Sequence, residues 1–124
     1  MNNNGDLWRL TAIAAARLIR AGKVHPIDLS EACLARIAER EPGVRAFVYF
    51  DPEYVRKSAA AALPGPLHGL PLGVKDVLDT ADMPSEYGSP IWQGWRPRAD
   101  AAAVAWARAA GAVVAGKTVT TDLR

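Results

Sequence analysis

Lys75 is the residue of this sequence whose surroundings most favour chemistry. It follows residues 70–74, LPLGV, which are expected to form a short strand. Side chains alternate between the two faces of a strand. One face then carries Leu70, Leu72 and Val74. The other face carries Pro71, Gly73 and Lys75. The first face is apolar and suits a core, whereas Gly73 leaves space in which another group can approach the Lys75 amine.

Two interpretations of Lys75 follow from this pattern. A lysine amine has an ordinary pKa of about 10.4, so it is a poor base at neutral pH. Burial lowers the pKa by up to about 3–5 units, which would make Lys75 a general base. The alternative is a lysine at a strand end with its amine in solvent, and the pattern alone favours this alternative.

A second lysine, Lys117, lies in GAVVAGKT, residues 111–118, which matches the phosphate-binding loop G-x-x-x-x-G-K-[ST]. That loop requires a strand before its first glycine and a helix after its lysine. Here a helix is expected before Gly111, and the β-branched residues that follow indicate a strand. Gly111 is better explained as a helix C-cap. Nucleotide binding is therefore not expected, and Lys117 is expected at a strand end or as a partner of a backbone group or carboxylate.

The other candidate residues favour structural roles. Cys33 lies in an apolar helical stretch and is expected to be a buried small hydrophobe. His25 is expected at a helix start, and His68 in a turn. Asp76 and Asp79 have a spacing that matches no metal site. No metal ion or cofactor is predicted.

Two sets of residues could face a site. The threonines that follow the last expected strand are candidates for substrate contact: Thr118, Thr120 and Thr121. The tryptophans are compatible with a core, a lid or an interface, and the sequence leaves these three roles open: Trp92, Trp95 and Trp106.

The elements that must position these residues alternate between helix and strand. Apolar spacing predicts helices over residues 7–21 and 26–40, joined closely enough to form an antiparallel hairpin. Gly22 is expected to end the first helix, and Pro42-Gly43 the second. Residues 44–50 are expected to form a strand.

The second half is expected to alternate in the same way. Asp51-Pro52 is expected to begin a helix that reaches about residue 62. Residues 76–99 show no sustained period and indicate a long loop, which in a compact domain is often functional. Asp100 is expected to cap the next helix, and residues 112–115 to form a buried strand.

The composition describes one globular domain. The chain has 124 residues, 50% of them hydrophobic, and a net charge of +2. So balanced a charge gives no reason to expect nucleic acid or an anionic membrane as a partner. No apolar run approaches the roughly 18 residues that span a bilayer, and the first residues lack the pattern of a signal peptide. With a single cysteine, the cytoplasm is the expected compartment.

Long ordered motifs give the sequence a family resemblance. GPLHGLPLGVKDVLDTADMPSEYGSP, followed by RADAAAVAWARAAGAVVAGKTVTTDL, resembles the N-terminal part of the amidase signature family. The opening helices and the strand with AFV are similar to the start of that family. The likeness covers essentially the whole chain, and it interprets GAVVAGKT as a helix end, a strand and a turn.

The resemblance implies an α/β fold, with a mixed β-sheet core flanked by helices and an opening helical hairpin. Residues 1–124 would be the N-terminal portion of one amidase domain, with the hairpin in 1–43 and the start of the sheet and its covering helices in 44–124. It also implies an amidohydrolase with a Ser–cis-Ser–Lys triad that cleaves a carboxylic amide through an acyl-serine. Lys75 takes the place of the triad lysine, with Thr120 and Thr121 on the substrate side.

The sequence departs from the family because the family's glycine- and serine-rich segment, which carries both triad serines, is absent. The serines present are Ser30, Ser58, Ser85 and Ser89, and none has that context. The chain is therefore expected to be a fragment, inactive alone, whose whole enzyme acts on a small-molecule amide by hydrolysis or amide transfer. Self-association of the fragment, or a homodimer of the whole enzyme, is the expected assembly. The alternative is a non-catalytic module that complements another polypeptide.

Overall fold

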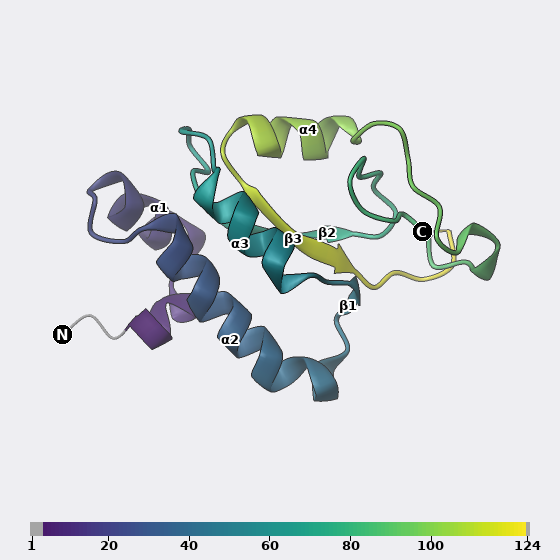
Figure 1. The fold of residues 1–124 in the computed structure, drawn as a ribbon, viewed down its shortest axis with the longest axis horizontal. Helices are drawn as coiled ribbons and strands as arrows, with labels where there is room; N and C mark the ends of the chain where they lie inside the picture. The colour runs from purple at the N-terminus through teal and green to yellow at the C-terminus, as the bar shows by residue number, and fades with distance from the viewer. Residues whose placement is uncertain (1–3, 124) are drawn as a thin grey trace.

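The computed structural model describes residues 4–123, and the ends of the predicted domain, residues 1–3 and 124, lie outside the described residues. A three-stranded sheet has helices on both of its faces, with α2 and α3 on one side and α4 on the other (Figure 1). The helices are α1 (Ala12–Arg20), α2 (Pro26–Val44), α3 (Pro52–Ala60) and α4 (Ala102–Ala109). The strands are β1 (Phe47–Tyr49), β2 (Pro71–Lys75) and β3 (Val113–Thr118). Two 3₁₀ helices, η1 (Asn4–Arg9) and η2 (Pro90–Trp92), complete the elements of the described chain.

The first helix is shorter than predicted. The expected helix over 7–21 is divided into η1 and α1, because Thr11 adopts an extended conformation and accepts a hydrogen bond from the Ala14 amide at 3.1 Å. This is an N-cap, which starts a helix wherever its side chain satisfies a free amide. Gly22 follows the end of α1 with φ +71°, as the glycine signal predicted.

Helix α2 continues past the predicted stop at Pro42-Gly43. It ends at Val44, and Arg45 caps it in the left-handed conformation. The Glu41 carboxylate stabilises this end because it accepts from the amides of Ala46 and Phe47, at 2.6 and 2.9 Å. The predicted strand over 44–50 is accordingly reduced to the three residues of β1. α2 packs most extensively against η1 and α3. It meets α1 through the apolar side chains of Ala15, Ile19 and Leu29.

The sheet order is β1-β3-β2, with β3 antiparallel to β1 and parallel to β2. Side chains from the central strand enter two cores. The α3-side cluster comprises Leu34, Val55, Ala59, Val113 and Ala115. The α4-side cluster comprises Val74, Met83, Val104 and Val114. β3 is thus covered on both faces, which accounts for its nearly continuous apolar sequence.

The prediction that Leu70, Leu72 and Val74 form one apolar face is only partly correct. Val74 is buried in the α4-side cluster, as expected. Leu72 is 36% exposed, and β2 is an edge strand that has no strand partner on its outer side among residues 4–123. Leu70 precedes the strand and packs with Ala15, Ile19 and Leu29 in a third cluster, between α1 and α2.

Residues 76–101 form the long loop that the sequence predicted, interrupted only by η2. The expected helix cap at Asp100 is wrong: Ala101 occupies the cap position and makes no side-chain cap. Asp100 instead accepts from the Ala81 amide at 2.8 Å and pairs with Arg108 at 3.1 Å. Its carboxylate therefore ties the loop to α4, and this tertiary partner replaces the local one.

Substitution of Gly111 tests how tightly the loop before β2 packs against the end of α4. It has φ +102°, and a Cβ atom there would lie 2.3 Å from the Leu63 carbonyl oxygen. We expect Gly111→Ala to lower the free energy of unfolding by about 3 kcal/mol, the sum of an unfavourable φ and overpacking. Urea denaturation followed by circular dichroism measures this change.

Gly22→Ala is the matched control for Gly111→Ala. Gly22 also has a positive φ, but a Cβ atom added there would meet no atom of the described residues within 4 Å. Its substitution should cost only about 1 kcal/mol, the penalty of the left-handed conformation. Equal losses at the two positions would show that the close approach at Gly111 has no energetic consequence.

Candidate functional site

The carboxyl ends of β2 and β3 form the candidate site, because parallel strands end at the same edge of a sheet. Lys75 is the last residue of β2 and pairs in register with Thr118, the last residue of β3. The side chain of Lys75 is exposed, and so is Gly73 two residues earlier, whereas Val74 between them is buried. Alternation therefore places Lys75 and Gly73 on one face of β2, as the sequence predicted.

Gly73 keeps the space beside Thr118 narrow but open. A Cβ atom on Gly73 would lie 3.1 Å from the Thr118 Cγ2 atom, so these two residues lie on the same face of neighbouring strands. The other predicted threonines, Thr120 and Thr121, follow β3 and approach the loop, where their carbonyl oxygens would lie 3.1 and 2.6 Å from a Cβ at Gly88. The structure thus brings Thr118 next to Lys75 and directs the backbone of 120–121 toward Gly88.

Lys117 lies inside β3 and is fully buried, with 0% of its surface exposed. It was expected at a strand end, but β3 continues to Thr118. Residues 111–118 therefore form a helix end and a strand, without the loop that would wrap a phosphate. These residues match the nucleotide-binding motif in sequence but do not adopt its structure, as the sequence context predicted.

A β-bulge directs Lys117 toward the loop that follows β2. Leu72 pairs with Val114 and Gly73 pairs with Gly116, so Ala115 is an extra residue in β3. In a regular strand Lys117 would share a face with Ala115, in the α3-side cluster. The extra residue shifts it to the face of its register partner Val74, on the opposite side.

Oxygen atoms of that loop surround the Lys117 amine. Nζ lies 3.1 Å from Asp76 Oδ1, 2.7 Å from Ser85 Oγ, 3.2 Å from Thr80 Oγ1 and 3.1 Å from the Pro84 carbonyl oxygen. An ammonium group has three donors and no acceptor, so four oxygen neighbours suit the charged form. Asp76, Thr80 and Ser85 are themselves buried. The sequence predicted a carboxylate or backbone partner for Lys117, and the structure supplies both.

The electrostatics of Lys117 combine two opposing effects. Burial lowers the pKa of the Lys117 ammonium from its ordinary value, and the hydrogen bond and charge of Asp76 act in the other direction. The proximity of Lys117 and Ser85 formally resembles a base beside a nucleophile. The amine, however, donates to Ser85 from a site that substrate cannot reach, so this pair is structural.

Asp76 connects this buried cluster to Lys75, its neighbour in sequence. Its amide donates to the Thr118 carbonyl oxygen at 2.9 Å, and its carbonyl oxygen accepts from the Tyr87 amide at 3.1 Å. Its carboxylate accepts from the Glu86 amide at 3.3 Å and pairs with Lys117. Every polar group of Asp76 therefore has a partner. Sequence reasoning missed the contact between Asp76 and Lys117. The available signal was Gly116, because a glycine inside a strand pattern indicates a β-bulge, and this bulge directs Lys117 toward Asp76.

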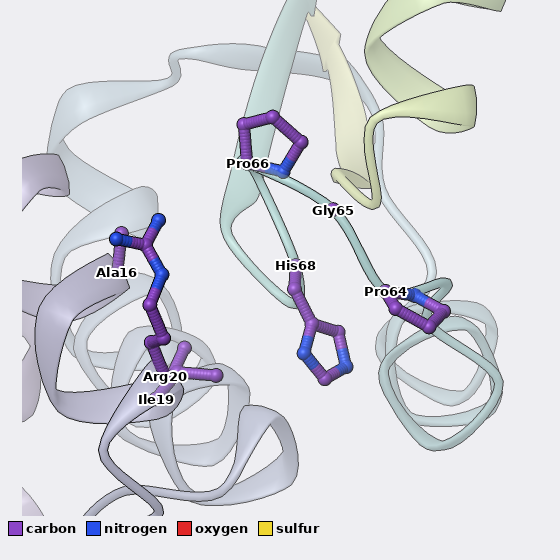
Figure 2. Close-up of a pocket in the computed structure, with 7 residues that line it drawn as sticks. All are labelled: Ala16, Ile19, Arg20, Pro64, Gly65, Pro66 and His68. Carbon is purple, nitrogen blue, oxygen red and sulfur yellow. The ribbon is translucent and has the colours of Figure 1, made fainter.

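A separate hollow of ≈ 420 Å³ lies between α1 and the loop before β2. Figure 2 shows that α1 contributes Ala16, Ile19 and Arg20 to it and that the loop contributes Pro64, Gly65, Pro66 and His68. Among the described residues that line it there is no serine, threonine or cysteine, so it lacks a nucleophile. His68 lies in this wall, in a turn as the sequence predicted, and its structural role stays a prediction.

The remaining candidates lie outside the Lys75 site. Trp92 and Trp95 are 40% and 44% exposed and make edge contacts with each other, while Trp106 on α4 is 79% exposed. None of the three therefore lies in a core formed by residues 4–123. Cys33 is half-buried against the cluster between α1 and α2, and burial raises the pKa of its thiol.

Metal-ligand clusters and membrane spans are both missing from the part of the chain that the structure describes. Across residues 4–123, histidine, cysteine and acidic side chains nowhere gather in threes as metal ligands would. Over the same residues, none of the helices has the length and apolar character needed to cross a membrane.

Comparison with known sequences identifies relatives along most of the chain. The family model described as Amidase matches residues 28–123. One subunit of the glutamyl-tRNA(Gln) amidotransferase of Chloroflexus aurantiacus is 40% identical over 120 residues, covering 90% of this chain and 25% of that protein. A putative amidase, AmiD, of Mycobacterium bovis is 36% identical over 122 residues, covering 92% of this chain and 26% of that protein.

Solved structures give the same result. A 6-aminohexanoate cyclic dimer hydrolase, complexed with substrate, superposes with a TM-score of 0.86 at 31% identity, over 95% of this chain and 25% of that one. The peptide amidase of Stenotrophomonas maltophilia superposes with a TM-score of 0.80 at 37% identity, over 90% and 25% of the two chains. The described fold is therefore part of the fold of these enzymes. The chain spans about a quarter of the length of the relatives it matches.

Proposed function

Because this chain belongs to the amidase family, we propose that it supplies the lysine of an amidohydrolase that cleaves a carboxylic C–N bond through an acyl-serine. The observation that carries the proposal is the position of Lys75. It ends an edge strand, beside a glycine and beside the end of the central strand, with its side chain exposed. A lysine there is accessible to groups from another part of a polypeptide.

The proposed reaction divides the chemistry between this chain and a serine-bearing segment. The neutral amine of Lys75 takes a proton from a bridging serine, which takes one from the nucleophilic serine. The nucleophile attacks the amide carbonyl, the C–N bond breaks, and the departing amine receives the proton. Water or another amine then attacks the acyl-serine. Backbone amides of that segment stabilise the oxyanion, and Thr120 and Thr121 lie on the substrate side.

The burial of a lysine base in the assembled enzyme is part of the proposal. A base must be neutral, and removal from water disfavours a charged amine. A segment that covers the carboxyl ends of β2 and β3 would supply such an environment in the assembled enzyme. We propose residues 1–124 as the N-terminal portion of one such domain, in the cytoplasm, with a small-molecule amide as substrate.

Ammonia release tests the proposal. The chain alone should release no ammonia from a peptide amide, because it does not contain the glycine- and serine-rich segment that is proposed to carry both triad serines. A chimera in which residues 1–124 replace the matched quarter of the Stenotrophomonas maltophilia peptide amidase should release ammonia. Turnover by the chain alone would contradict the proposed division of labour. A chimera that folds by circular dichroism yet has no turnover would count against a catalytic contribution and favour a non-catalytic module.

A further inference from the structure

The buried cluster around Lys117 lies directly behind the Lys75 site. It comprises Asp76, Thr80, Ser85 and Lys117, all with at most 1% of their surface exposed. Asp76 and Lys117 lie on the side of Val74, opposite to Lys75. The hydroxyl groups of Thr80 and Ser85 lie at the Lys117 amine on that same side. The cluster therefore cannot take part in the chemistry by contact, and its effect on Lys75 must pass through the backbone.

Stability alone does not explain a buried charge pair in this place. Removing two charges from water carries a desolvation cost, and apolar residues of similar volume often stabilise a core as well or better. The α4-side cluster adjoins the pair and could have been extended with such residues. A charged pair fixes the orientation of the groups that bond to it, because its hydrogen bonds form only at defined angles and distances.

Hydrogen bonds of the cluster side chains and of the adjoining backbone surround the peptide that joins Lys75 to Asp76. Ser85 accepts from the Thr80 amide at 3.2 Å and donates to the Leu78 carbonyl oxygen at 3.4 Å, which closes the loop around the Lys117 amine. The Lys75 carbonyl oxygen accepts from the Leu78 amide at 2.9 Å. With Asp76 bonded to β3 and to Tyr87, this peptide has little freedom to rotate.

We propose that the Lys117–Asp76 pair is a positioning device that sets the direction in which the Lys75 side chain leaves β2. The proposal rests on the proposed function of Lys75, but it concerns the geometry of this chain alone. Lys117 and Asp76 are positioning residues and do not touch substrate. The bulge at Ala115 is the feature that makes the device available, because it brings Lys117 to the side of Asp76.

Amide hydrogen exchange in the chain itself tests the proposal without any substrate. The double variant Lys117→Met/Asp76→Asn removes both charges together, so it avoids leaving one of them unpaired in the interior. The Asp76 and Tyr87 amides, which hold the Lys75–Asp76 peptide, should exchange at least about tenfold faster than in the parent chain. The Val113 amide, which donates to the Leu70 carbonyl oxygen at 2.9 Å at the far end of the sheet, should keep its rate.

The control variant Lys57→Met/Asp122→Asn makes the same chemical changes at exposed positions and should alter none of these rates. Ser85→Ala is a second, milder variant, which removes one oxygen at 2.7 Å from Lys117 and should accelerate the same two amides to a smaller extent. Nitrogen relaxation should also detect increased motion of the Lys75 backbone in both cluster variants. A uniform acceleration that includes Val113, or unchanged protection of Asp76 and Tyr87, would overturn the proposal. Neither result depends on turnover, so a failure here is distinct from a failure of the amidase proposal.

Discussion

Lys75→Met in the peptide amidase chimera is expected to reduce the rate of ammonia release by about 10²–10⁴-fold. This is the range in which a positioned general acid or base contributes to an enzymatic rate. Methionine has nearly the length of lysine but no amine, so it removes the base while it occupies the same space. Lys75 is the last residue of β2, and methionine brings no charge into a position that the covering segment encloses, so the fold should be retained. Initial rates at saturating peptide amide measure the effect.

Two further variants separate loss of the base from other changes. Lys75→Arg keeps the positive charge, but guanidinium cannot be deprotonated in a protein, so its loss of rate should match that of methionine. Lys57→Met, at an exposed position of α3, should leave the rate unchanged. If Lys75→Arg retains most of the activity, the role of Lys75 is to supply charge, and the general-base assignment is wrong.

Lys117→Met is expected to lower the free energy of unfolding of the chain by about 3–5 kcal/mol. Removal of one partner of a buried ion pair leaves the other charge uncompensated, and this is more costly than removal of both. Asp76 is 1% exposed, so its carboxylate would remain without water or a counter-ion. Urea denaturation followed by circular dichroism measures the loss. For a domain whose total stability is about 5–15 kcal/mol, the variant could lose much of its folded population.

The double variant Lys117→Met/Asp76→Asn should recover most of that loss, because no unpaired charge then remains in the interior. A double-mutant cycle with the single variant Asp76→Asn gives the coupling energy of the pair. If Lys117→Met is no more destabilising than Lys57→Met, Lys117 is not held by the buried pair that the structure describes. Recovery of stability without recovery of amide protection at Asp76 would separate the positioning role from the stabilising one.

Local sequence signals predicted the elements whose ends are fixed by nearest neighbours. α3 begins where Asp51-Pro52 predicted it, because the Asp51 carboxylate accepts from the Glu53 amide at 3.0 Å within one turn. Pro26 likewise opens α2, and Gly22 ends the helix before it. The same signals failed at Pro42 and Asp100. At Pro42 the Glu41 carboxylate stabilises a later helix end through the amides of Ala46 and Phe47, and at Asp100 the carboxylate pairs with Arg108 in place of a local cap.

The candidate site was likewise predictable in part from the sequence and in part only from the tertiary structure. The sequence by itself determined the family, through long ordered motifs, and the strand end and face of Lys75, through the alternation of Gly73, Val74 and Lys75. Only the tertiary structure decided that Leu72 lies at an open sheet edge and that Lys117 pairs with Asp76. The physical reason is register: one extra residue at Ala115 reverses the face of every side chain after it, and the pairing of β3 with β2 is what reveals that residue.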